Sequence, residues 1–145
     1  MLSNLGTTAE ELFRQGFNCA EALSSAVAEN CHIESRAIPH IATPFGAGMG
    51  GKGGACGCLT GGMMGIGLMY GRSDPNDLQR KKMAYEKTKR FHDQFIERFG
   101  STNCLDICGT DISTEENLKK FHDEGKRDEC AKVVRETAAI LAEIL

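Results

Sequence analysis

The chain has 145 residues, of which 41% are hydrophobic and 26% are charged, and its formal net charge is −3. We expect one domain, residues 1–145, that is large enough to bury a core. No basic run is present, which argues against nucleic acid or an anionic membrane surface as a partner. The N-terminal sequence also lacks the basic region and apolar run of a signal peptide, so we expect a cytoplasmic protein with no membrane insertion.

The first third of the chain has helical periodicity. Thr7 or Thr8 begins a capping-box pattern, and the periodicity after it predicts a single helix that ends near Asn30–His32. The buried stripe of that helix would be Leu12, Gly16, Cys19, Leu23 and Val27. Ser35 is expected to cap a short helix that is limited by two prolines.

Residues 45–71 are the most unusual stretch of the chain. Residues 45–54 are nearly all small, and residues 55–70 carry no charge, which predicts a glycine-rich loop followed by a buried central helix. Gly57, Gly61 and Gly65 recur every four residues and so lie on one face of that helix, where another helix or a cofactor can approach closely. Cys56 and Cys58 lie where the loop becomes helix.

The second half of the chain predicts further helices. Asp74 is expected to cap the longest one, which would end at Gly100. Its buried stripe would be Leu78, Tyr85, Thr88, Phe91, Phe95 and Phe99. The segments predicted after it are a short turn or single-turn helix within residues 101–109, a charged helix capped by Ser113, and a last helix from Arg127 to Leu145.

The last helix has a clear apolar stripe, formed by Cys130, Val134, Ala138, Leu141 and Leu145. No segment shows the period-two alternation or the hairpin turns of β-strands. The predicted fold class is therefore all-α, a single-domain helical bundle around the glycine-rich central helix.

Seven cysteines are the main chemical feature of this chain. In a cytoplasmic protein of this size they favour metal binding or redox chemistry over structural disulfides. Cys19, Cys56, Cys104 and Cys130 hold distinct positions and can converge if the helices form one bundle. Four thiolates suit an iron–sulfur cluster or tetrahedral zinc.

The exact set of ligands stays open at this point. Cys58 and Cys108 are alternatives to Cys56 and Cys104, and the spacings C-x-C and C-x₃-C match no standard short signature. Cys56 is expected to be the most reactive thiol because a helix N-terminus lowers the pKa of a cysteine. Backbone amides near Gly54 and Gly57 are candidate contacts to a bound cofactor.

Three functions fit these residues. The first is a redox or electron-transfer protein with an iron–sulfur cluster, the second is a cofactor-free protein that cycles between thiol and disulfide, and the third is a binding module with structural zinc. The sequence does not indicate a substrate, an enzymatic reaction or a redox partner protein. It is compatible with a monomer or a homodimer.

The cysteine pattern resembles a known family. Residues 17–22 (FNCAEA), Cys56-Gly57-Cys58-Leu59-Thr60-Gly61, and then Cys104 and Cys130 resemble the C_GCAxxG_C_C family of redox-active proteins, taken here as the motif C…CGAxxG…C…C. The chain departs from that pattern at Cys58, where the motif has alanine, and it has additional thiols at Cys31 and Cys108. The resemblance implies a redox role, with related domains associated with iron–sulfur binding, and it implies no particular substrate.

Overall fold

A computed structural model describes residues 2–145, and every regular element within that range is a helix. The all-α prediction is confirmed. The elements are α1 (Leu5–Arg14), α2 (Cys19–Asn30), α3 (Ala37–His40), the 3-10 turn η1 (Thr43–Phe45), α4 (Gly46–Met49), α5 (Gly57–Tyr70), α6 (Leu78–Phe99), α7 (Cys104–Cys108), α8 (Glu115–Asp123) and α9 (Lys126–Ile144).

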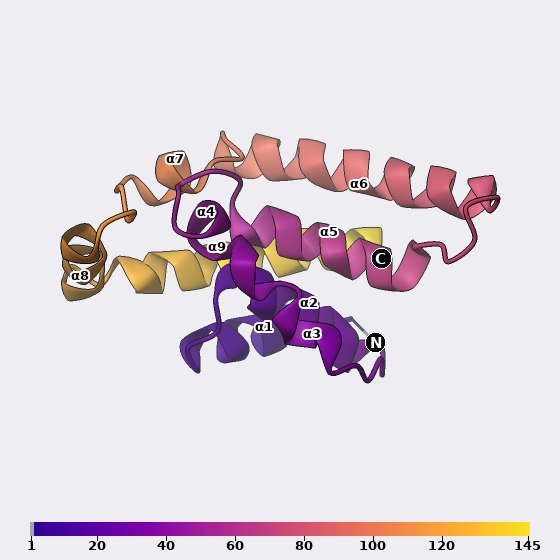
Figure 1. The fold of residues 1–145 in the computed structure, drawn as a ribbon, viewed down its shortest axis with the longest axis horizontal. Coiled ribbons are helices and arrows are strands. Elements are labelled where there is room, and N and C mark those ends of the chain that lie inside the picture. Colours follow the sequence, from indigo (N-terminus) through magenta and orange to yellow (C-terminus); the bar gives the residue numbers. More distant parts are fainter. Residues whose placement is uncertain (1) are drawn as a thin grey trace.

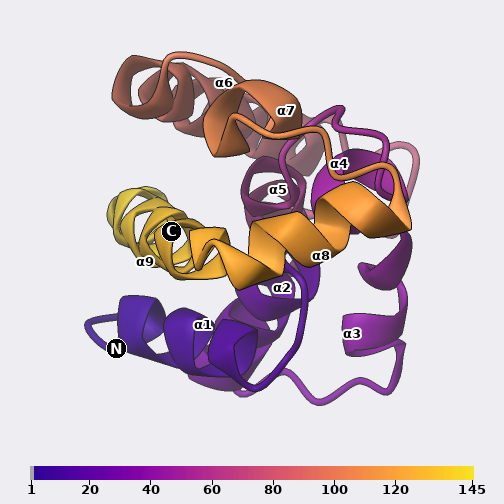
Figure 2. The same cartoon turned by 90° about the vertical axis from the view of Figure 1, so that its left-hand side faces the viewer.

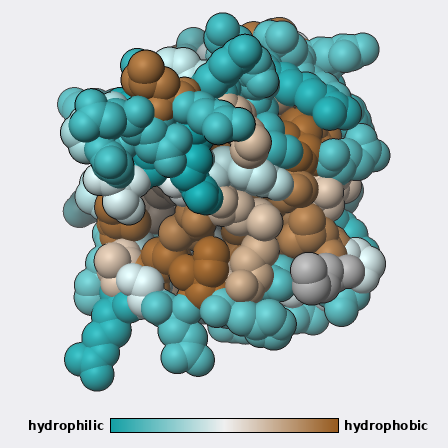
Figure 3. Space-filling model, turned by 90° about the vertical axis from the view of Figure 1, so that its right-hand side faces the viewer, coloured by the Kyte–Doolittle hydropathy of each residue, from teal (hydrophilic) through white to brown (hydrophobic). Residues whose placement is uncertain are grey.

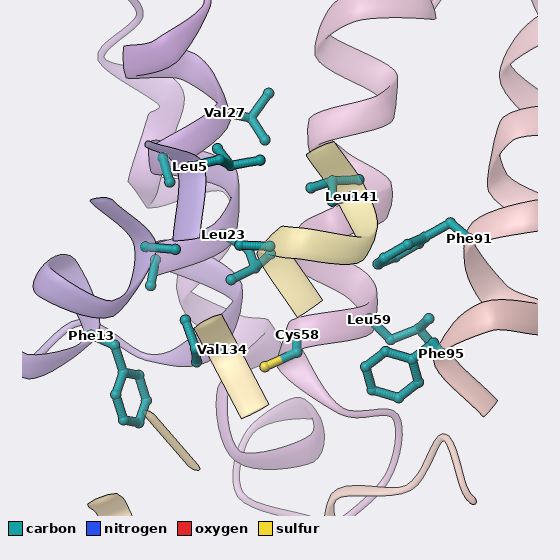
Figure 4. Packing of buried hydrophobic residues seen from close by; sticks show 14 of the residues in the cluster. Leu5, Phe13, Leu23, Val27, Cys58, Leu59, Phe91, Phe95, Val134 and Leu141 are labelled. Atoms are coloured by element: carbon teal, nitrogen blue, oxygen red, sulfur yellow. The ribbon is translucent and has the colours of Figure 1, made fainter. Parts of the chain in front are cut away.

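The central helix is α5, which packs against α2, α6 and α9 (Figure 1). Helix α1 packs against α2 and α9 (Figure 1). The buried side chains form one core, to which Leu23, Leu59 and Phe91 contribute from three different helices (Figure 4). Helix α5 contributes side chains to this core and directly follows the glycine-rich loop. The packing of α5 therefore fixes the position of the loop.

The glycine face of α5 allows it to approach α2 closely. A Cβ added to Gly61 would lie 2.7 Å from the carbonyl oxygen of Ala20, and one added to Gly65 would lie 2.7 Å from Cγ2 of Val27. The predicted close approach at these glycines is confirmed. Gly62 makes room on another side of α5, for the ring of Phe91 in α6.

The first predicted helix is in fact two helices. Gly16 has φ +116°, a conformation that side-chain-bearing residues rarely adopt, and it breaks the helix after α1. Asn18 then starts α2 with a capping box: its Oδ1 accepts from Glu21 N–H at 2.9 Å, and Glu21 Oε1 accepts from Asn18 N–H at 3.1 Å. The expected cap at Thr7 or Thr8 is wrong, because α1 already begins at Leu5.

Helix α6 is the longest helix of the described chain and ends at Gly100 as predicted, but it begins later than expected. Asp77 caps it by accepting from Arg80 N–H at 2.9 Å, whereas Asp74 accepts from Asn76 N–H within the preceding turn. Its expected stripe is only partly buried: Phe91 and Phe95 are inside, whereas Leu78 is 67% and Tyr85 58% exposed. The beginning of α6 lies at the end of the molecule, where hydrophobic side chains reach the surface (Figures 1 and 3).

The last two helices follow the predicted pattern closely. Thr114 caps α8 in place of Ser113, with Oγ1 accepting from Asn117 N–H at 3.2 Å. Along α9, Val134, Ala138 and Leu141 are buried as the stripe predicts. Among the helices of residues 2–145, none combines the length and apolar character that crossing a bilayer requires.

Candidate thiol site

Six of the seven cysteines line a single small cavity. The cavity has a volume of about 30 Å³ and lies at the end of the molecule where α4, α7 and α8 gather (Figure 2). The cysteines that line it are Cys19, Cys56, Cys58, Cys104, Cys108 and Cys130. The fold therefore brings together every cysteine named above as a candidate ligand, from four separate helical segments.

Cys31 lies outside this group. It follows the last residue of α2, and its Sγ lies 3.5 Å from Sδ of Met69 near the C-terminal end of α5. Burial raises the pKa of the Cys31 thiol above its ordinary value. The additional thiol Cys31 is thus a neighbour of the core and not a member of the thiol cavity.

Each helix presents its cysteine at an end or on an inner face. Cys19 is the first residue of α2, directly after the capping box, and Cys56 directly precedes α5. Cys104 and Cys108 are the two ends of α7, and Cys130 lies near the beginning of α9. The placement of Cys56 at the helix N-terminus and of Cys130 on the inner stripe agrees with the sequence-based expectation.

A short antiparallel pairing holds two of these segments together. Cys56 N–H donates to the carbonyl oxygen of Thr102 at 2.7 Å, and Cys104 N–H donates to that of Gly54 at 2.6 Å. The pairing fixes α7 beside the beginning of α5, so that Cys56 and Cys104 face the same cavity.

The two glycines expected to contact a cofactor are placed differently. Gly57 lines the cavity, whereas the backbone of Gly54 is engaged elsewhere: its N–H donates to Gly48 and its carbonyl accepts from Cys104. The N–H groups of residues 50–54 all donate to carbonyl oxygens of residues 44–49. These loop amides therefore shape the loop and do not point at the cavity.

The loop itself is strained where it meets the cavity. Ala47 has φ +52° and Met49 has φ +69°, left-handed conformations that cost free energy for residues with a Cβ. Ala47 is one of the residues that line the cavity. Strain of this kind is concentrated at functional sites, which makes the loop part of the candidate site.

Three of the six cavity thiols, Cys58, Cys104 and Cys130, hold their protons more tightly than free cysteine. The pKa of Cys58 is raised by its contacts with the Cys19 and Cys56 thiols and by full burial. Burial, with the nearby thiols, raises the pKa of Cys104 well above its ordinary value and that of Cys130 to about 12. Without a compensating positive charge, these sulfurs are therefore neutral at physiological pH.

Cys56 differs from these three thiols, because its pKa is lowered. Its contact with the Cys58 thiol lowers the pKa, burial opposes this, and the backbone N–H groups of Cys58 and Leu59 lower the pKa further. The thiolate of Cys56 is therefore favoured over those of Cys58, Cys104 and Cys130, which is the chemistry of a nucleophile or a ligand.

The donor set fits a thiophilic metal group, although no coordination polyhedron is already formed. Within residues 2–145, no three Cys, His, Asp or Glu side chains are arranged to hold one metal ion. The cavity offers sulfur donors almost alone, with apolar neighbours Ile107 and Val133. Six sulfurs exceed the four that a single zinc ion or cluster takes from the protein.

Comparison with known proteins identifies the family. Residues 17–144 match the family described as "Putative redox-active protein (C_GCAxxG_C_C)". The chain belongs to this family. A protein of Archaeoglobus fulgidus, described as an uncharacterized protein, is 33% identical over 104 residues, which are 67% of this chain and 69% of the relative. No solved structure matches the chain.

The family motif also corrects the register given above for the central cysteine. The letters GCAxxG coincide with residues 57–62, GCLTGG, at the cysteine and both glycines, with Leu59 in place of the alanine. In this register Cys58 is the central motif cysteine, not Cys56. Cys58, which coincides with the motif cysteine in this register, is fully buried and lines the thiol cavity.

Some residues that shape the site are not singled out by the sequence patterns considered above. Asn18, which orients Cys19, has a recognisable signal because Glu21 follows three residues later. The contact between Phe13 and Arg127 has no such signal, because the two residues are 114 positions apart in the sequence and meet only in the fold.

Proposed function

We propose that this protein is a redox or electron-transfer protein that holds an iron–sulfur cluster in the thiol cavity. The ligands would be Cys19, Cys104, Cys130 and one cysteine at the beginning of α5, with Cys108 as the alternative to Cys104. The register of the family motif favours Cys58 over Cys56 as the ligand from α5. When bound, such a cluster accepts and releases single electrons.

One observation supports this proposal above the others: six sulfurs from four helical segments share one buried cavity. Without a metal, the thiolate forms of these cysteines are disfavoured, since burial raises the pKa of Cys104 and Cys130. The positive charge of a bound metal group compensates the negative charge of the deprotonated sulfurs and so stabilises the thiolates inside the protein.

A second candidate function follows from the contrast between Cys56 and Cys58. Cys56 has a lowered pKa and directly contacts a protonated neighbour, which is the arrangement of an attacking thiolate beside a second thiol. A thiol–disulfide protein without a metal would use such a pair, with electrons exchanged with the dithiol or disulfide of a partner. Structural zinc is the third candidate.

Anaerobic purification separates these functions. We expect coloured protein with visible charge-transfer absorption and with iron and acid-labile sulfide in stoichiometric amounts. Colourless protein that contains zinc would support the binding module, and colourless metal-free protein the thiol–disulfide cycle. Either of those two results would overturn the proposal.

The ligand assignment has its own test. Cys19→Ser and Cys130→Ser should each lower the iron content to the background of metal-free protein, because each removes a sulfur from the cavity, while circular dichroism remains helical. Cys31→Ser is the matched control and should retain full iron, since Cys31 is remote from the cavity. Full iron in either cavity variant would show that the replaced cysteine is only a core residue.

A further inference from the structure

A second pocket lies against the thiol cavity. This outer pocket has a volume of about 100 Å³ and shares Cys19, Ala47, Cys104, Cys108 and Cys130 with the thiol cavity. Helix α8 contributes Leu118, Phe121 and His122 to its lining. Any small molecule that occupies the outer pocket therefore lies beside the sulfurs.

The walls of the outer pocket are largely apolar. Phe13 of α1, Leu118 and Phe121 of α8, and Ile112 in the α7–α8 connection line it. Leu118 is 39% exposed, whereas Phe121 is only 5% exposed, so the apolar lining extends from the surface into the interior. Such walls suit a ligand with a flat or compact hydrocarbon body.

A single strong cation faces this apolar pocket. Nη2 of Arg127 donates to the carbonyl oxygens of Phe13 at 2.7 Å and Phe17 at 3.0 Å, and the guanidinium carbon lies 3.9 Å from the centre of the Phe13 ring. These contacts anchor the guanidinium group but leave its charge uncompensated. Within residues 2–145, no carboxylate forms an ion pair with Arg127, and no acidic residue lines the outer pocket.

We propose that the outer pocket binds a compact organic anion, with its carboxylate on Arg127 and its apolar body against Phe13, Leu118 and Phe121. An anchored guanidinium group loses little side-chain freedom on binding and presents several donors to a carboxylate. The binding of this anion does not depend on the proposed function. A role for the anion as a substrate of the thiol site would rest on the proposed function.

Calorimetric titration with benzoate and with its uncharged analogue benzamide tests this proposal. We expect benzoate to bind saturably and benzamide to bind at least about tenfold more weakly, as the loss of a charge-assisted hydrogen bond predicts. Arg127→Gln should weaken benzoate by a similar factor. Lys132→Gln, which removes the same charge from an exposed position of α9, should leave the affinity unchanged.

A second pair of variants avoids the backbone contacts of Arg127. Leu118→Glu and Leu118→Gln, of the same size, both remove one apolar contact, but only Leu118→Glu also places a negative charge at the rim, so it should weaken benzoate clearly more than Leu118→Gln does. This pair decides the matter if Arg127→Gln fails to fold. The proposal is wrong if both ligands bind equally, if neither binds saturably below about 10 mM, or if Leu118→Glu and Leu118→Gln behave alike.

The same samples separate this inference from the proposed function. Iron and sulfide are measured on each preparation before titration. Metal-free protein that binds benzoate through Arg127 would contradict the iron–sulfur proposal alone. Iron-containing protein that ignores benzoate would contradict the anion pocket alone.

Discussion

The pKa values of Cys56 and Cys58, which are separated by one residue, are shifted in opposite directions. Cys56 lies just before α5 and is stabilised as a thiolate by the Cys58 thiol and by backbone N–H groups at the beginning of the helix. Cys58 lies one residue inside the helix, is fully buried, and faces the sulfurs of Cys19 and Cys56, which raise its pKa. At the scale of single residues, the contacts among the thiols, together with the backbone N–H groups at the beginning of α5, decide which thiolate is favoured.

We predict that Cys56 reacts fastest with iodoacetamide in the metal-free, reduced protein, because the thiolate is the reactive species. Cys56 is 5% exposed, so a small uncharged reagent is required. Mass spectrometry of partially labelled protein measures the order of reaction. Cys31 is the internal reference, since burial raises its pKa, and faster labelling of Cys31 would contradict the prediction.

At the scale of elements, the packing of α5 against α2 determines the position of the site. Gly57, at the first turn of α5, faces the backbone of Ala20 and the side chain of Cys19, and Gly61 faces Ala20 one turn later. These contacts place the beginning of α5 against the beginning of α2, so that Cys19 and Cys58 reach one cavity. A wider helix separation would move the sulfurs apart.

Gly61→Ala and Gly67→Ala should therefore have opposite effects on stability. The Cβ of the first would lie 2.7 Å from a backbone oxygen, and we expect overpacking to cost about 1–3 kcal/mol. Gly67 is exposed on the same helix with nothing within 4 Å, so alanine there should stabilise by up to about 1 kcal/mol through helix propensity.

Urea titration of wild type and both glycine variants measures this difference. A higher midpoint for Gly61→Ala than for wild type would show that the close-packing explanation is wrong. Unchanged stability of Gly67→Ala would instead question the use of helix propensity at that site.

At the scale of the whole molecule, folding gathers several thiols that prefer to remain protonated. The folded pKa of Cys130 is raised from 9.0 to about 12, mainly by burial and then by the nearby cysteines. A raised folded pKa means that the folded state binds the proton more tightly than the unfolded state does. Its contribution to stability is therefore complete below about pH 9 and is lost as the pH rises towards 12.

We predict that the reduced, metal-free protein loses stability steeply between about pH 9 and pH 12. Cys130→Ser removes one titrating sulfur, so its free energy of unfolding should fall less steeply over that range. Lysine and tyrosine side chains titrate in both proteins, and their effects cancel in the comparison. Parallel stability curves for wild type and Cys130→Ser would contradict this account.

The sequence by itself determined the helical class, the glycine face of α5 and the stripe of α9, because each follows from a periodicity that is local to one helix. It also indicated the cysteines that line the cavity. Only the tertiary structure decided that Leu78 and Tyr85 are exposed and that Arg127 meets Phe13. These features depend on which surfaces of different helices cover one another, and spacing along a single helix carries no information about its partner.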